Sequence, residues 1–182
     1  MKRIKILEWK KISLVVPEKQ DIEMWYKWIN DIETQAVLWS MYWNIIFKED
    51  EEEFYEIIRK DKNKRMFMIY VNKDKKVIWN IDLMNIDFQH RKATLWIVIF
   101  DKDSREKWYW TESIKLILKY WFEVLGLNKV NLKFIDFNSR AKKVYEKIWF
   151  KECGRLKEEM FVNWKYHDDI YMEIFARDFL KK

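Results

Sequence analysis

The chain has 182 residues, of which 49% are hydrophobic and 36% charged, and this balance excludes both a disordered chain and a membrane-spanning one. Its net charge of +6 comes from 36 basic and 30 acidic residues scattered through every segment, so we expect a solvated surface and no nucleic-acid partner. The single cysteine, Cys153, excludes an internal disulfide, and we expect it to be a buried or half-buried thiol in a protein without a metal site.

The N-terminal half predicts one strand, two helices and three further strands. Alternating apolar residues predict a strand over 10–16. An apolar face at helical spacing predicts a helix from Asp21 to Asn30, and the acids that open 49–60 complement the N-terminus of a second helix. An antiparallel meander is then expected from three β segments, 65–71, 77–84 and 94–100.

The C-terminal half predicts two more helices and three strands. A long helix over 111–125 should end at Gly126, because glycine accepts the left-handed conformation that closes many helices. The other expected elements are a strand over 129–137, a helix over 138–148 and a closing hairpin of 161–165 with 167–175. There are no repeats or Pro/Gly-rich linkers, so we expect a single α/β (α+β) domain over 1–182.

The passage from strand 94–100 into the helix at Thr111 is a candidate anion site. Unpaired backbone N–H groups at a helix N-terminus suit a phosphate or pyrophosphate. Such a loop normally needs glycine, whereas Trp108 and Trp110 stand where the backbone would approach the anion. The phosphate signal is therefore weak as the chain is written.

The segment 138–150 carries a more specific motif. It reads N-x-x-A-x-x-x-Y-x-K-x-W-F from Asn138 to Phe150. With the loop before it, this segment resembles the Gcn5-related N-acetyltransferase (GNAT) superfamily, in particular its ribosomal-protein and spermidine acetyltransferase branch, and the resemblance extends over most of the chain. Both loop glycines of the family pattern are replaced by tryptophan here. The resemblance implies a central mixed, mostly antiparallel, splayed sheet flanked by helices, with acetyl-CoA as co-substrate in the gap.

The resemblance also implies roles for particular residues. Tyr145 would act as the general acid that protonates the departing thiolate, Asn138 would bond the coenzyme arm, and Thr111 could add a hydroxyl. The pantetheine would pair with the backbone of Ile97, Val98 and Ile99. The pyrophosphate would lie on the backbone N–H groups of Arg105, Glu106, Lys107, Trp108, Tyr109 and Trp110. Tyr145 could instead be a helix tyrosine that only packs on the sheet.

The acceptor of such an enzyme would be a primary amine, on a polyamine, a protein N-terminus or an amino sugar. No general base is evident, and the amine's proton could simply leave through water. The candidate bases are His167, Asp168, Asp169, Asp82 and Asp87, while His90 is expected at the surface of a turn. A homodimer is possible in such a family. Glu8 interrupts the basic opening and no apolar stretch of signal-peptide length follows it, which predicts a cytoplasmic protein without a membrane partner.

Tryptophan stands at many positions where glycine is expected. The chain has 2 glycines and 12 tryptophans, whereas average usage of about 7% would give roughly 13 glycines. Asn163-Trp164 falls where Asn-Gly would form a type I′ turn, and Trp149 falls at a helix C′ position. Ten tryptophans are suspect: Trp9, Trp39, Trp43, Trp79, Trp96, Trp108, Trp110, Trp121, Trp149 and Trp164.

One hypothesis explains this pattern: up to ten of these positions are glycine in the natural protein. One route is a UGA codon that some bacterial lineages read as glycine and that is translated here as tryptophan, and a deliberate Gly-to-Trp design is another. If the tryptophans are real, bulky rings would fill the coenzyme cleft, and we expect a weak or inactive enzyme. The chain would then be a non-catalytic acyl-CoA-binding or interaction module on the same fold.

Overall fold

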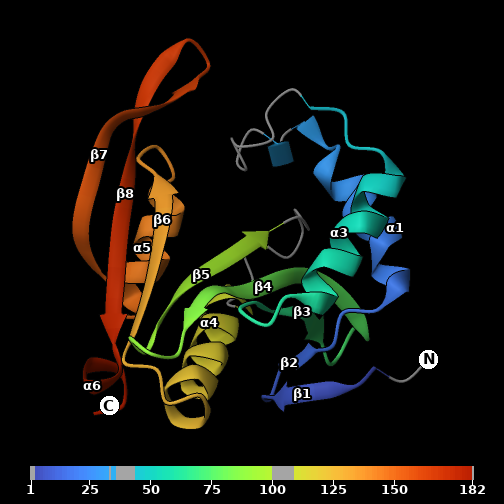
Figure 1. The fold of residues 1–182 in the computed structure, drawn as a ribbon, viewed down its shortest axis with the longest axis horizontal. Coiled ribbons are helices and arrows are strands. Elements are labelled where there is room, and N and C mark those ends of the chain that lie inside the picture. Colours follow the sequence, from blue (N-terminus) through green and yellow to red (C-terminus); the bar gives the residue numbers. More distant parts are fainter. Residues whose placement is uncertain (1–2, 33, 36–43, 100–108, 182) are drawn as a thin grey trace. The chain divides into compact units, whose positions relative to one another are not determined.

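The computed structural model describes residues 3–32, 34–35, 44–99 and 109–181, with only the backbone for 98 and 99. Figure 1 shows a mixed α/β fold. The strands are β1 (Lys5–Glu8), β2 (Ile12–Val15), β3 (Arg65–Val71), β4 (Lys76–Asp87), β5 (Lys92–Ile99), β6 (Lys129–Ile135), β7 (Lys151–Val162) and β8 (Lys165–Phe175). The helices are η1 (Lys19–Asp21), α1 (Ile22–Ile29), α3 (Lys48–Lys60), α4 (Tyr109–Lys119), the π-helical turn η3 (Tyr120–Val124), α5 (Ser139–Lys147) and α6 (Ala176–Phe179).

The strands form one eight-stranded sheet in the order β1-β2-β3-β4-β5-β6-β8-β7. The pairs β1/β2, β2/β3, β6/β8 and β7/β8 are antiparallel, whereas β5 and β6 are parallel. Short turns join β3 to β4 and β4 to β5, which requires antiparallel neighbours because a parallel pair needs a long crossover. The mixed, mostly antiparallel sheet expected from the family resemblance is thus confirmed.

The chain divides into two compact units, and the first comprises Met1–Asp82 with Ile97–Glu106. In this unit α1 packs against α3. The spacing of the apolar residues in α1 buries Trp25 against the rings of Phe54 and Tyr55 from α3. Trp25 belongs to a buried cluster with Val15, Ile22, Met68 and Val77.

The second unit comprises Leu83–Trp96 with Lys107–Lys182. Its long helix, α4 continued by η3, buries an apolar face and ends as expected at Gly126, whose φ of +65° needs no Cβ penalty. Helix α5 joins β6 to β7 (Figure 1). It presents one buried stripe, formed by Ala141 and Tyr145, while its lysines remain at the surface.

The predicted elements are confirmed, with two differences at the edges of the sheet. The strand β1 was not predicted, because its four residues are largely exposed and carry no apolar alternation. The strand β7 begins at Lys151, ten residues earlier than expected, since the charged and exposed stretch 151–160 is paired by its backbone to β8 rather than held by a buried face. Cys153 lies on this stretch and is exposed, so the expected burial of its thiol was wrong.

Two suspect tryptophans occupy backbone conformations that favour glycine. Trp149, directly after α5 and its C-cap, has φ +74°, and Trp164 has φ +61° beside Asn163 at +50°. The latter two residues form a two-residue type I′ turn between β7 and β8. A side chain with a Cβ is disfavoured at positive φ. Both local predictions, a left-handed residue after the helix and a type I′ turn, are therefore confirmed.

The remaining suspect tryptophans give weaker support for glycine at their positions. The indole N–H groups of Trp79, Trp110 and Trp121 are buried without a hydrogen-bond partner, but so is that of Trp25, a helix residue that is not suspect. The unpaired N–H therefore does not separate the two groups. Trp39, Trp43 and Trp108 lie outside the described residues.

Two further features follow from the described residues alone. None of the helices among them is long and apolar enough to cross a membrane. Within the same residues, the His, Cys, Asp and Glu side chains form no group of three that could hold a metal ion.

Candidate active site

The parallel pair β5/β6 is the place where the family resemblance implies a splayed sheet. The described ladder between the two strands joins Lys92–Thr94 to 129–131 and goes no further, whereas β6 stays paired with β8 up to Ile135. Ile97, Val98 and Ile99 lie on β5 beyond the last paired residue. Their backbone groups therefore carry no described ladder bond to β6. A strand needs such unpaired backbone groups if it is to pair with a ligand.

The predicted phosphate loop is only partly visible. Arg105, Glu106, Lys107 and Trp108 lie outside the described residues. Helix α4 begins at Tyr109, so that Tyr109, Trp110 and Thr111 form its first turn, where backbone N–H groups have no partner within the helix. These groups and the positive end of the helix dipole suit an anion.

Asn138 caps helix α5 at the end of the turn that leaves β6. Its side-chain Oδ1 accepts a hydrogen bond from the backbone N–H of Ala141 at 3.0 Å, which satisfies one of the unpaired groups at the helix start. The side-chain amide N–H groups point to no acceptor among the described hydrogen bonds. Asn138 can therefore cap the helix and donate to a ligand at the same time.

Tyr145 is buried among aromatic rings on the α5 side of the sheet. Its ring lies 5.6 Å from that of Phe134, 5.8 Å from that of Phe150 and 5.9 Å from that of Trp110, measured between centroids. Burial raises the pKa of the Tyr145 phenol above its usual range, so the hydroxyl is protonated at neutral pH and can donate. Trp110 takes up space directly beside this predicted acid.

Two of the candidate bases are engaged in local ion pairs far from Tyr145 in sequence. Asp82 is buried on β4, where it accepts from Asn80 at 3.0 Å and pairs with Lys64 at 3.1 Å, and burial raises its pKa. Asp87 accepts from the backbone and the ring of His90 in an exposed turn, which lowers the pKa of the carboxyl. His90 is a surface residue, as expected.

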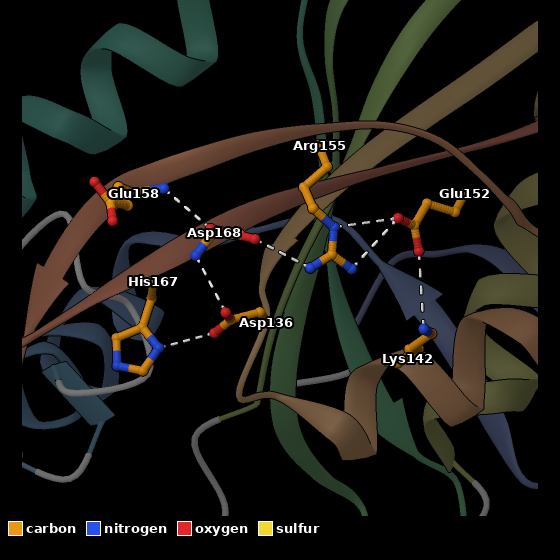
Figure 2. Close-up of polar contacts among 7 residues, drawn as sticks. All are labelled: Asp136, Lys142, Glu152, Arg155, Glu158, His167 and Asp168. Carbon is orange, nitrogen blue, oxygen red and sulfur yellow. Dashed lines mark hydrogen bonds and ion pairs between the residues drawn. The ribbon is translucent and has the colours of Figure 1, made fainter.

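His167 and Asp168 belong to a polar cluster around the start of β8 (Figure 2). The imidazole Nδ1 of His167 lies 2.8 Å from Asp136, and the ring packs edge-on against Phe137. Asp168 accepts from the backbone N–H of Glu158 and from Arg155, and these bonds lower its pKa. Each carboxylate oxygen of Asp168 therefore accepts one bond from β7, and the side chain holds the two strands of the hairpin together.

Asp169 differs from the other candidates. It is 0% exposed, and its Oδ2 pairs with Lys133 Nζ at 2.7 Å. Its other carboxylate oxygen, Oδ1, is buried and has no hydrogen-bond partner among the described residues. A buried carboxylate oxygen without a donor is costly, so this atom is a candidate contact for a cationic ligand.

Sequence reasoning missed two partners in this region, Asp136 and Lys133. Each is an ordinary charged residue in the printed sequence, and only the strand pairing brings Asp136 to His167 and Lys133 to Asp169. The one available signal was the alternation in β6, which places Lys133 and Ile135 on the same face of the sheet.

A comparison with protein families matches residues 11–151 to a family described as "Acetyltransferase (GNAT) domain". The match covers more than half of the chain. The chain belongs to the GNAT acetyltransferase family. The resemblance noted in the motif at 138–150 is thereby confirmed.

Known relatives point to the same chemistry. The chain is 28% identical over 169 residues to spermidine N(1)-acetyltransferase of Escherichia coli K12, covering 90% of this chain and 85% of the relative. It is 31% identical to the Vibrio cholerae spermidine N(1)-acetyltransferase over 74% of this chain and 76% of the relative. It also matches a putative ribosomal N-acetyltransferase of Bacillus subtilis at 32% identity, over 54% of this chain and 53% of that protein.

A solved structure agrees with these relatives. The spermidine N-acetyltransferase of Vibrio cholerae, in complex with CoA and spermine, has a TM-score of 0.84 and 26% identity, covering 93% of this chain and 98% of that one. Family membership, relatives and fold together establish an N-acetyltransferase that uses acetyl-CoA as its co-substrate and a small-molecule amine as acceptor.

Proposed function

We propose that the protein acetylates a primary amine of an aliphatic polyamine such as spermidine. The observation that carries the proposal is the similarity over nearly the whole chain to an enzyme whose structure holds CoA and spermine. The similarity to a putative ribosomal N-acetyltransferase covers about half of each chain, which favours the polyamine over a protein N-terminus.

The chemistry assigned to this chain's residues is direct transfer. The free amine attacks the thioester carbonyl carbon, a C–N bond forms, and the C–S bond breaks. Tyr145 gives its phenolic proton to the departing thiolate, the surplus proton of the amine passes to water or to a base, and the Tyr145 phenolate then regains a proton from water. The backbone N–H groups of the first turn of α4 hold the pyrophosphate, and backbone groups of Ile97, Val98 and Ile99 hold the pantetheine.

Two variants of Asn138 test its role in holding the coenzyme arm. Asn138→Asp keeps the oxygen that caps α5 but loses the amide donor, so we expect unchanged stability and a weaker affinity for acetyl-CoA. Asn138→Ala should lose both the capping oxygen and the amide donor, with a further stability cost of about 1 kcal/mol for the missing cap. Thermal unfolding and calorimetric titration with acetyl-CoA measure the two effects. Unchanged affinity in both variants would show that Asn138 is only a cap.

An acceptor panel tests the substrate class. Spermidine, spermine, peptides with free N-termini, amino sugars and aminoglycosides are offered with acetyl-CoA, and both the released thiol and the mass of the product are measured. We expect the highest kcat/KM with the polyamines. A preference for peptides would replace the polyamine by a protein acceptor, and no turnover with any amine would favour a non-catalytic acyl-CoA-binding module.

A further inference from the structure

Asp169 lies at the end of β6/β8 pairing where the described ladder to β5 is already lost. Ile135 and Asp169 form the last residue pair between β6 and β8. The neighbouring pair is Phe134 with Ile170, and the ring of Phe134 packs on Tyr145. Because successive side chains of a strand point to opposite faces, Asp169 points away from the face that carries Tyr145.

The two oxygens of the Asp169 carboxylate have different surroundings. Oδ2 is held by Lys133, whose side chain is 31% exposed and therefore connects the buried carboxylate to the surface. Oδ1 has no donor among the described residues. A carboxylate with one oxygen held in place and the other unsatisfied is a fixed acceptor for one additional N–H group, and a charged donor gives the strongest bond.

We propose that Oδ1 of Asp169 accepts a hydrogen bond from an ammonium group of the acceptor and thereby positions the acceptor molecule for acetyl transfer. This inference rests on the proposed function for the identity of the acceptor. In acyl transfer the amine attacks the carbonyl carbon from above the plane of the thioester, whereas the departing sulfur lies in that plane, so the group that holds the amine and the acid that protonates the sulfur need different positions. A cation held on the face opposite Tyr145 agrees with that requirement, because Tyr145 serves the thiolate. Asp169 is thus a specificity-determining residue for a cationic, aliphatic amine.

Calorimetric titration of spermine into the protein with CoA present tests this assignment without relying on turnover. Asp169→Asn is nearly isosteric but removes the negative charge. We expect it to weaken spermine binding by roughly 10- to 100-fold, the usual loss for one charge-assisted hydrogen bond, with little change in CoA affinity. In steady-state kinetics the loss should fall on KM for the amine rather than on KM for acetyl-CoA.

A matched control lies on the same strand and face. Glu173 pairs with Lys129 at 3.2 Å, as Asp169 pairs with Lys133. Unlike Asp169, Glu173 has no carboxylate oxygen that is both buried and without a hydrogen-bond partner. Glu173→Gln should leave spermine affinity unchanged. Lys133→Met, which removes the competing ammonium, should bind spermine at least as tightly as the wild type and provides a second test should Asp169→Asn fail to fold.

The outcomes separate this inference from the proposed function. Equal spermine affinity in the wild type and Asp169→Asn, weaker affinity in Lys133→Met, or no binding by the wild type would overturn the assignment. A structural role alone would lower the melting temperature and CoA affinity together with spermine affinity. Binding of spermine through Asp169 without acetyl transfer would uphold the assignment and refute the proposed function.

Discussion

Replacing Tyr145 by Phe is expected to lower kcat by about 100-fold or more, with little change in acetyl-CoA affinity, because general acid catalysis typically contributes that much to rate. The variant keeps the ring that packs on Phe134 and Phe150 and removes only the phenolic oxygen. Steady-state kinetics with acetyl-CoA and spermidine, together with calorimetric titration of acetyl-CoA, measure the two quantities. The loss should be seen in kcat and kcat/KM alike.

Tyr166→Phe is the control for this experiment. Tyr166 lies on the exposed part of β8, and the same substitution there should leave kcat unchanged. If Tyr145→Phe is as active as the wild type, Tyr145 is a packing residue and another group supplies the proton. The raised pKa of Tyr145 makes this a genuine test, since burial keeps the phenol protonated but also makes it a weaker acid.

The second large effect concerns stability. Trp149→Gly and Trp164→Gly are each expected to stabilise the protein by about 1 kcal/mol, because each removes a Cβ from a backbone held at positive φ. Trp164 is 90% exposed and gives up little burial, whereas Trp149 loses a ring contact with Phe179. Chemical denaturation of both variants and of the double variant measures the gain.

The matched control is a tryptophan on a helix. Trp25→Gly should destabilise the protein by about 3 to 5 kcal/mol, because the side chain is buried against α3 and glycine is a poor helix former. Destabilisation by Trp149→Gly or Trp164→Gly would show that tryptophan is tolerated at that position. The intact mass of the protein from its native source decides the wider hypothesis: a mass that matches the written chain would rule out glycine at the ten positions.

Local signals in the sequence predicted the elements that are governed by local physics. The type I′ turn at Asn163-Trp164, the helix end at Gly126 and the left-handed position at Trp149 all follow from rules that act within a few residues. The strands β1 and the first part of β7 escaped prediction because backbone pairing with a neighbouring strand, rather than a buried face, holds them. Pairing of that kind leaves no pattern in the residues themselves.

The candidate site was predictable only where a motif names its residues. Asn138 and Tyr145 belong to one helix and its cap, and the motif identified both. The ion pair of Asp169 with Lys133 joins two residues that lie 36 positions apart in the sequence, and it arises from the register of β6 against β8. No spacing in the sequence distinguishes Asp169 from Asp168, although the first is fully buried and the second is held by Arg155.

Thermal unfolding with and without acetyl-CoA, on the written chain and on a version with glycine at the ten suspect positions, tests directly whether this fold holds an acetyl-CoA site. Binding to the folded state should stabilise it by about 2.7 kcal/mol at a hundredfold excess over Kd. We expect this shift for the glycine version and a smaller one for the written chain, where Trp110 lies against Tyr145. No shift in either version would contradict an acetyl-CoA site in this protein.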